Sequence, residues 1–333
     1  MTNASSILVV IPTLNEAAHI EDCVHALLRD PAARRARVLV VDGGSTDATR
    51  AIVAKLHCEF PNVSLRPNPR RLQAAAMNLA ASDASEEVLI RCDAHASYPE
   101  NFLTLLADAL ACTGAHSVVV PMDAVGQGCF QRAVAWIVDS PLGSGGAAHR
   151  GGAITGFIDH GHHAAFAMAK FKEIGGYDES FSHNEDAEFD RRLTVAGGRI
   201  WIDENIRIGY FPRASFTALW RQYWNYGRGR ARMLIKHRLA PKPRQMIPVV
   251  NLTLVILSLL FAIVPAFGGL RLLGFVWPAA YLMLLSGASL AIALWKRSLC
   301  GLGAGPALFA IHNAWALGFM KCAVGALAKA KPA

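Results

Sequence analysis

The distribution of charge along the chain is the feature that most constrains its fold. All 25 Asp and Glu residues lie at or before Glu204. Residues 1–204 also hold 17 Lys and Arg, which gives a formal charge of −8, whereas residues 205–333 hold 16 and no acid, which gives +16. Such a split predicts an acidic globular part followed by a cationic part that faces an anionic partner, either nucleic acid or a membrane.

The hydropathy of the second part favours a membrane over nucleic acid. Three stretches are almost free of charge, at residues 247–267, 272–295 and 304–328. A helix needs about 20 apolar residues to cross a bilayer, and three such runs in succession are not expected of a soluble protein. Eight Lys and Arg, without any acid, lie at residues 221–244. A basic segment directly before an apolar run is typical of the cytoplasmic side of a membrane.

We therefore expect a membrane domain of two to three helices at residues 246–333, preceded by an amphipathic, basic and aromatic interface segment at residues 216–245. Crossing by all three helices would leave Lys329 and Lys331 outside, so a re-entrant or interfacial third segment is an alternative. In either arrangement Lys321 must snorkel or face protein.

The N-terminus and the cysteines indicate on which side of a membrane the first part of the chain lies. Residues 1–6 are polar and the apolar run Ile7–Ile11 is too short for a signal core, so we expect no signal peptide. The seven cysteines are scattered without metal or redox spacing, which predicts free thiols and no disulfide framework in a domain facing the cytosol.

Residues 1–215 are expected to form the globular domain, and the first 125 of them alternate between apolar, strand-like runs and amphipathic helices. The expected strands are residues 7–11, 38–41, 88–90 and 118–121. The expected helices are residues 15–28, 48–57 and 99–110. This alternation indicates βαβ units and a mainly parallel, Rossmann-like sheet. Ligands bind at the carboxyl ends of strands in such sheets, and here these ends carry the polar groups at residues 12–16, 42–47 and 93–95.

Two acidic motifs follow predicted strands. Asp42 opens DGGSTDAT, where a carboxylate can accept hydrogen bonds from a base or a ribose; a capped helix start is the alternative interpretation of this stretch. Asp93 and His95 form a D-x-H triplet. An acid and an imidazole at this spacing can share Mg²⁺ or Mn²⁺, which keeps open positions for phosphate oxygens.

A third cluster, FSHNEDAEFDRRL, runs from Phe181 to Leu193 and contains four acids. Asp186 or Glu185 is placed to take a proton from an acceptor hydroxyl, which is the task of a general base. The other acids of the cluster are expected to complement a helix dipole or to pair with neighbouring arginines.

The ordered motifs IPTLNE, VVDGGSTDAT, RCDAHASYP and GGYDESFSHNEDAEFDRRL resemble those of the family 2 inverting glycosyltransferases, over about residues 5–235. D-A-H, NED, QYWNYGR and an apolar C-terminal part narrow the resemblance to succinoglycan-type exopolysaccharide transferases. The resemblance implies a GT-A type nucleotide-diphospho-sugar transferase fold. It also implies transfer of a sugar from a nucleotide-sugar, a UDP-hexose, to a polyprenyl-diphosphate-linked saccharide at the cytoplasmic face of a bacterial inner membrane.

The resemblance assigns roles to individual residues. Those assigned to the nucleotide are Pro12, Glu16, Asp42, Arg71 and Gln73. Those assigned to the metal and the donor diphosphate are Asp93 and His95. Asp186 would deprotonate the acceptor, with Glu185 beside it, and the residues assigned to the acceptor diphosphate or lipid carrier are Gln222, Tyr226 and Arg228.

The sequence departs from the family pattern at its histidines. His95 stands where many members have a second acid, so the metal would depend more on Asp93. The segment IDHGHHAAF brings His160, His162 and His163, which could reach a metal or a diphosphate, although exposed loop histidines are the commoner case.

Three other functions are compatible with parts of the sequence. A polyprenyl-monophosphate glycosyltransferase would make a lipid-linked donor with the same motifs. A processive synthase is disfavoured, because Q-x-x-R-W is absent and the membrane part is small. A non-catalytic membrane scaffold is disfavoured because Asp42, Asp93 and Asp186 are all present.

Overall fold

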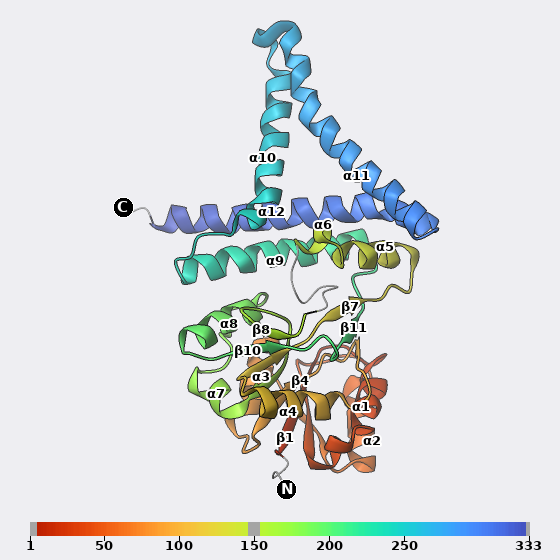
Figure 1. Ribbon diagram of the computed structural model, residues 1–333, viewed down its shortest axis with the longest axis vertical. Helices are drawn as coiled ribbons and strands as arrows, with labels where there is room; N and C mark the ends of the chain where they lie inside the picture. The colour runs from red at the N-terminus through yellow and green to blue at the C-terminus, as the bar shows by residue number, and fades with distance from the viewer. Residues whose placement is uncertain (1–4, 146–153, 331–333) are drawn as a thin grey trace. The chain divides into compact units, whose positions relative to one another are not determined.

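The computed structural model describes residues 5–145 and 154–330, and the chain forms two compact units (Figure 1). The first unit contains residues 1–123 and 147–210, and the second contains residues 124–146 and 211–333. The division at residues 215 and 245 expected from the sequence therefore differs from the observed one. Residues 124–146 join the second unit because the apolar side of their helix packs with helices near the C-terminus.

The first unit is built around an eight-stranded sheet in the order β3-β2-β1-β4-β9-β6-β10-β8. β1, β2, β3 and β4 pair in parallel, as do β6 and β10, whereas β9 runs antiparallel between β4 and β6, and β8 pairs antiparallel with β10. The strands are β1 (Ile7–Thr13), β2 (Ala36–Asp42), β3 (Val63–Pro67), β4 (Val88–Arg91), β6 (Ser117–Val119), β8 (Gly156–Ile158), β9 (His163–Ala167) and β10 (Ile200–Ile202). The mainly parallel α/β architecture expected from the sequence is confirmed.

A second, three-stranded sheet has the order β5-β11-β7. Its strands are β5 (Ala96–Ser97), β7 (Met122–Ala124) and β11 (Ile208–Tyr210). β5 directly follows the D-x-H triplet, so the residues after β4 turn into this small sheet instead of continuing the large one.

Helices cover both faces of the large sheet because alternate residues of each strand point to opposite faces. Ile7, Val9 and Ile11 pack in one core, with α1 (Ile20–Leu28), α2 (Thr49–Glu59) and α4 (Phe102–Thr113). Leu8 and Val10 pack in the other core, with α3 (Gln73–Ser82), α7 (Met168–Glu173) and α8 (Glu185–Val195). A short 3-10 helix, η1 (Pro31–Arg35), precedes β2.

The start of α1 differs from the sequence prediction. The helix begins at Ile20 and not at Asn15, because Asn15 has a left-handed backbone (φ 59°) and its loop is hydrogen-bonded to the loop after β2. β1 also continues through Pro12. A proline is tolerated there because β4 pairs with β1 only as far as Val10, so that edge of the strand needs no donor.

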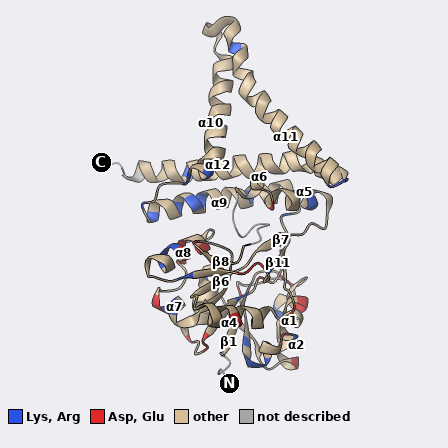
Figure 2. Ribbon diagram, in the orientation of Figure 1, with Lys and Arg blue, Asp and Glu red and all other residues tan. Residues whose placement is uncertain are grey.

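The second unit is helical. Its elements are α5 (Cys129–Val138), α6 (Pro141–Ser144), α9 (Phe216–Lys236), α10 (Pro243–Ile263), η2 (Pro265–Phe275), α11 (Val276–Trp295), η3 (Leu299–Gly303) and α12 (Ala304–Ala330). One buried cluster joins Val134 of α5, Leu219 of α9, Leu285 of α11 and Leu308 of α12. Three segments are long and apolar enough to cross a membrane, as expected, and Figure 2 shows the Lys and Arg residues concentrated on α9 within this unit.

One expectation about the cysteines is wrong. Cys129 of α5 and Cys300 of η3 form a disulfide, although they are 171 residues apart. Sequence spacing gave no sign of this pair because only the packing of the second unit brings α5 and η3 together. The other five cysteines are free, in accord with the expectation: Cys23, Cys58, Cys92, Cys112 and Cys322.

Candidate active site

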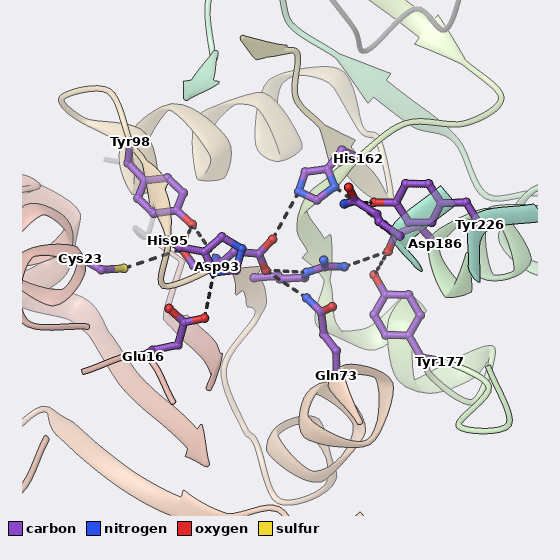
Figure 3. A network of polar contacts seen from close by, with 12 residues as sticks. Glu16, Cys23, Gln73, Asp93, His95, Tyr98, His162, Tyr177, Asp186 and Tyr226 are labelled. Atoms are coloured by element: carbon purple, nitrogen blue, oxygen red, sulfur yellow. Dashed lines mark hydrogen bonds and ion pairs between the residues drawn. The ribbon is translucent and has the colours of Figure 1, made fainter. Parts of the chain in front are cut away.

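Arg91, the buried last residue of β4, donates hydrogen bonds to two acids, Asp93 and Asp186, which Figure 3 labels. Its Nε donates to Asp93 Oδ1 at 3.3 Å, and its Nη1 donates to Asp186 Oδ1 at 2.9 Å. Burial alone would lower the pKa of Arg91, but the carboxylates of Asp93 and Asp186 raise it well above its usual range. One fixed cation therefore joins the predicted metal motif to the predicted general base.

Asp93 is held on several sides. Gln73, at the start of α3, donates from Nε2 to Asp93 Oδ1 at 3.0 Å, and the Asp93 backbone N donates to the Tyr98 hydroxyl at 2.6 Å. Burial alone would raise the pKa of Asp93, but Arg91, His162 and His95 outweigh it and the pKa is lowered. The structure thus keeps an ionised carboxylate at this strand end, and it places Gln73 beside Asp93.

Asp186 lies in the first turn of α8, after Asn184, whose left-handed backbone (φ 67°) precedes the helix. The Tyr177 hydroxyl donates to Asp186 Oδ1 at 2.9 Å, the same oxygen that Arg91 contacts. Two donors on one oxygen fix the orientation of the carboxylate, which is a requirement for a positioned base.

Glu185 differs from Asp186 in its surroundings. It is buried, and its Oε2 has no hydrogen-bond partner among the described residues. Burial and the neighbouring Asp186 raise its pKa from its ordinary value near 4.5 to about 7. Glu185 is buried and its carboxylate is not oriented by a donor to Oε2, whereas Asp186 is partly exposed and is oriented by Arg91 and Tyr177, so Asp186 is the better candidate for the base.

The remaining acids of α8 have structural partners. Glu188 is fully buried and pairs with Arg192, whose Nε and Nη2 lie 2.9 Å and 2.8 Å from its carboxylate oxygens. Asp190 Oδ2 lies 2.5 Å from His160 Nδ1. The pairing of one spare acid with a neighbouring arginine is as expected, whereas the pairing with His160 was not foreseen.

His160 and His162 are not simple exposed loop residues. His162 lies between the two catalytic candidates, with Nε2 3.8 Å from Asp93 Oδ2 and Nδ1 3.8 Å from Asp186 Oδ2 (Figure 3). His160 is the partner of Asp190. The exposed-loop interpretation is therefore wrong for His160 and His162, while the His163 side chain lies outside the described residues.

Asp42 lies at the end of β2, where it closes the turn that follows. Its Oδ2 accepts from the Gly44 backbone N at 3.1 Å, and its Oδ1 accepts from the Ser45 hydroxyl at 2.5 Å. The sequence gave no structural reason for this acid, and the structure supplies one. The Arg71 side chain lies next to the same turn: a methyl group added to Gly44 would be 3.4 Å from Arg71 Nη2.

The loops after β1 and β2 are tied together. Asn15 N donates to Ser45 Oγ at 2.8 Å, and Glu16 N donates to Thr49 Oγ1 at 2.8 Å. The Glu16 side chain reaches the D-x-H triplet, with Oε1 2.9 Å from His95 Nδ1. The structure thus brings Glu16 to the metal motif, which the sequence did not indicate.

The Thr13 hydroxyl was also missed. It is buried at the end of β1, one residue after Pro12, without a partner among the described residues. An unpaired buried hydroxyl costs free energy, so it is a group that a ligand at this strand end would satisfy.

The residues around Asp93 fit a divalent cation in their chemistry. An ionised carboxylate lies close to His162 and next to the imidazole of His95. Mn²⁺ accepts oxygen and nitrogen ligands together. The described residues contain no cluster of three or more His, Cys, Asp or Glu arranged to hold a metal, so oxygens of a bound diphosphate would have to complete the coordination.

The predicted acceptor residues lie on α9 in the second unit. Gln222 Nε2 donates to the Tyr226 hydroxyl at 2.9 Å, one helical turn along. Arg228 is on the same helix, and the assigned roles of all three remain predictions.

A mainly parallel sheet with a D-x-H triplet at a strand end and an oriented carboxylate across from it defines a glycosyltransferase with a GT-A type fold. Residues 8–175 match the family described as Glycosyl transferase family 2. The chain is also 44% identical over 328 residues to the succinoglycan biosynthesis protein ExoA of Rhizobium meliloti (strain 1021), covering 96% of both chains. The chain therefore belongs to glycosyl transferase family 2.

Two further relatives are more distant. A protein of Methanococcus voltae is 25% identical over 244 residues, covering 69% of this chain and 74% of its own length. Its name is dolichyl N-acetyl-alpha-D-glucosaminyl phosphate 3-beta-D-2,3-diacetamido-2,3-dideoxy-beta-D-glucuronosyltransferase. The mannosyltransferase PcManGT from Pyrobaculum calidifontis, solved with GDP-Man and Mn²⁺, has a TM-score of 0.58 at 19% identity and covers 96% of this chain and 88% of its own.

The fold is also shared by GalNAc-T7, solved with UDP, GalNAc and Mn²⁺. The TM-score is 0.51 at 18% identity, over 64% of this chain and 44% of that chain. At these identities the structural likenesses establish the fold, and they agree with the GT-A architecture of the first unit.

Proposed function

We propose that this glycosyltransferase moves a sugar from a nucleotide-sugar, a UDP-hexose, to a polyprenyl-diphosphate-linked saccharide during exopolysaccharide biosynthesis. The observation that carries the proposal is the shared guanidinium of Arg91, which holds Asp93 and Asp186 in one network. Donor activation and acceptor deprotonation need two acidic groups with different tasks within the length of a substrate. The position of Asp93 and Asp186 on one guanidinium supports giving them these two tasks.

The reaction would be a direct displacement with inversion. Asp186 accepts the proton of the acceptor hydroxyl as its oxygen attacks the anomeric carbon, and the nucleoside diphosphate leaves from the opposite face. Arg91 and Tyr177 keep the Asp186 carboxylate aimed during proton transfer. Only one base is then required, and Glu185, with its raised pKa, is not needed for that task.

The donor side of the site would be formed by the strand ends. Asp93 and His95 would hold Mg²⁺ or Mn²⁺. The bound ion would neutralise the negative charge that develops on the leaving diphosphate. Pro12, Glu16 and the turn closed by Asp42 would line the nucleotide pocket. Support comes from the relatives solved with GDP-Man or UDP together with Mn²⁺.

The acceptor proposal rests on relatives and on the second unit. ExoA is named for succinoglycan biosynthesis, and the Methanococcus voltae relative is named for a dolichyl-linked sugar phosphate. The apolar helices α10 and α11 and the basic helix α9 would hold the enzyme at the cytoplasmic face of a bacterial inner membrane. Gln222, Tyr226 and Arg228 of α9 would then meet the diphosphate of the acceptor.

An assay of products tests the proposal. Membranes containing the protein are supplied with UDP-hexoses, Mn²⁺ and either a polyprenyl-diphosphate-linked saccharide or polyprenyl monophosphate, with membranes containing Asp186→Asn as the control. We expect elongation of the diphosphate-linked saccharide, detected as a mass increase of one hexose, with inverted anomeric configuration by NMR. Transfer to the monophosphate alone would instead identify a polyprenyl-monophosphate glycosyltransferase.

A further inference from the structure

The last helix, α12, is paired with α9 in the second unit (Figure 1). A methyl group on Gly227 of α9 would collide with the carbonyl oxygen of Trp315, and one on Gly318 of α12 would collide with the carbonyl oxygen of Trp224. The two backbones therefore touch at two successive places. Half of the apolar window of α12 is buried within the protein, against 11% for each of the other two apolar helices.

Its partner α9 cannot cross a bilayer. It carries five cationic side chains: Arg221, Arg228, Arg230, Arg232 and Lys236. Each Arg or Lys at the centre of a membrane helix disfavours insertion strongly. A helix whose backbone lies against α9 at two places must stay at the same depth as α9, at the membrane surface.

The chain also returns to the α9 side before α12 begins. Cys300 of η3, between α11 and α12, is bonded to Cys129 of α5, and a methyl group on Gly303 would lie 3.0 Å from Ala133 of α5. α5 lies in residues 124–146, a short segment of the second unit that is inserted in the sequence between the two parts of the first unit. α10 and α11 thus leave the α9 side and come back as a hairpin.

The charges agree with this path. With two crossings, a single cation, Arg271, lies at the far end of the hairpin. Among the residues beyond α9 whose side chains the structure describes, the other cations lie on the near side: Arg238, Lys242, Arg244, Lys296, Arg297 and Lys321. That asymmetry is the positive-inside pattern, and a third crossing would carry Lys329 and Lys331 to the wrong side.

We propose that α12 is an in-plane helix and not a third span. On this proposal, α9 and α12 form a platform that binds the anionic head groups of the cytoplasmic leaflet, α10 and α11 are the two crossings, and the C-terminus lies on the catalytic side. Phe309, Val324 and Leu327 of α12 are exposed and would reach the acyl boundary, as in interfacial amphipathic helices. The inference rests on the proposed membrane location of the enzyme.

Labelling of full-length cysteine variants in intact bacterial cells tests the number of crossings. Gly269, near the hairpin tip, and Gly325, on α12, both have open space where a side chain would be added. With a membrane-impermeant maleimide, Gly269→Cys should be labelled in intact cells, whereas Gly325→Cys and the unaltered protein should be labelled only after lysis. Labelling of Gly325→Cys from outside would overturn the two-crossing arrangement.

Two further measurements separate the possible failures. A C-terminal fusion of the full chain to green fluorescent protein should fluoresce, and the same fusion to alkaline phosphatase should be inactive; the reverse result overturns the proposal. If α10 and α11 do not cross, Gly269→Cys remains unlabelled and carbonate extracts the protein from membranes, which rejects the membrane location and not the transfer reaction. Sugar transfer is then measured separately with detergent-dispersed acceptor.

A pair of variants tests the α9–α12 contact itself. Gly318→Leu should separate the helices and speed tryptic cleavage after Lys321 in purified protein, whereas Gly325→Leu, which meets no neighbouring atom, should not. Equal cleavage rates for both variants and the unaltered chain would show that α12 is not held against α9.

Discussion

Asp93 and Asp186 accept hydrogen bonds from a single guanidinium, that of Arg91, although one follows β4 and the other lies in the first turn of α8. His162 lies 3.8 Å from the other oxygen of each carboxylate. Arg91 and His162 thus join the acid predicted to hold the metal to the acid predicted to be the base.

Replacing Asp186 by Asn should abolish turnover while nucleotide binding is retained. The amide keeps the size of the side chain but cannot accept the acceptor proton, and loss of a general base reduces kcat by about 10²–10⁴-fold. Steady-state transfer and calorimetric titration with UDP measure the two effects. Glu59→Gln, at the exposed end of α2, is the matched control; equal loss of binding and turnover in Asp186→Asn would argue against a role as base.

Arg91→Lys and Arg91→Met should differ from one another. Lysine keeps the charge but cannot reach both carboxylates as a fork, so we expect a folded enzyme with kcat reduced by about 10²-fold. Methionine leaves two half-buried carboxylates without their buried cation, which costs about 1–3 kcal/mol of stability. Thermal unfolding and kcat are compared with Arg37→Lys, whose partner Glu86 is remote from the site; an active Arg91→Met enzyme would contradict this account.

Removal of divalent metal should stop transfer. Chelator-treated protein is expected to be inactive and to recover with Mn²⁺, and Asp93→Asn should weaken Mn²⁺ binding in the presence of UDP by at least about 10-fold. Electron paramagnetic resonance of Mn²⁺ measures this binding independently of activity, with the exposed acid change Asp83→Asn as the control. Full activity in excess chelator would remove Asp93 and His95 from the metal role.

Glu185 should make the protein less stable as the pH rises. Its pKa is raised to about 7 in the folded state, so between about pH 4.5 and pH 7 the folded protein retains a proton that the unfolded chain has lost. The unfolded state then binds fewer protons, and stability falls with pH across this window, by about 3 kcal/mol in total. Glu185→Gln should remove this fall and raise Tm at pH 8 relative to the unaltered protein; an unchanged pH profile of Tm would refute the assignment.

The sequence predicted β1, β2, β4 and β6 of the large sheet, because these strands are short apolar runs. It missed β3 and α3, and it missed the left-handed Asn15, whose loop is hydrogen-bonded to the loop after β2. The candidate site was predicted at Asp93 and Asp186, which stand in recognisable motifs. Arg91 could have been suspected, since it is a cation at the end of an otherwise apolar strand.

Other parts of the site were not accessible from the sequence. His162 reaches the two carboxylates only because β9 inserts antiparallel between β4 and β6, an order that no local pattern signals. The same holds for the Cys129–Cys300 pair, where two helical segments far apart in the chain meet by packing alone. Hydrophobic periodicity indicates local helices and strands, but it does not indicate which distant segments will pack together.

The second unit draws its helices from two separate parts of the chain, and this affects biosynthesis. The apolar side of α5, with Val134, Ile137 and Val138, is covered by α9, α11 and α12, which leave the ribosome much later. At elongation rates of about 5–20 residues per second the gap is on the order of ten seconds, during which nascent α5 needs a chaperone or the membrane as a temporary cover. A chain truncated at residue 215 would never gain that cover, and we expect it to accumulate in inclusion bodies instead of as a free enzyme.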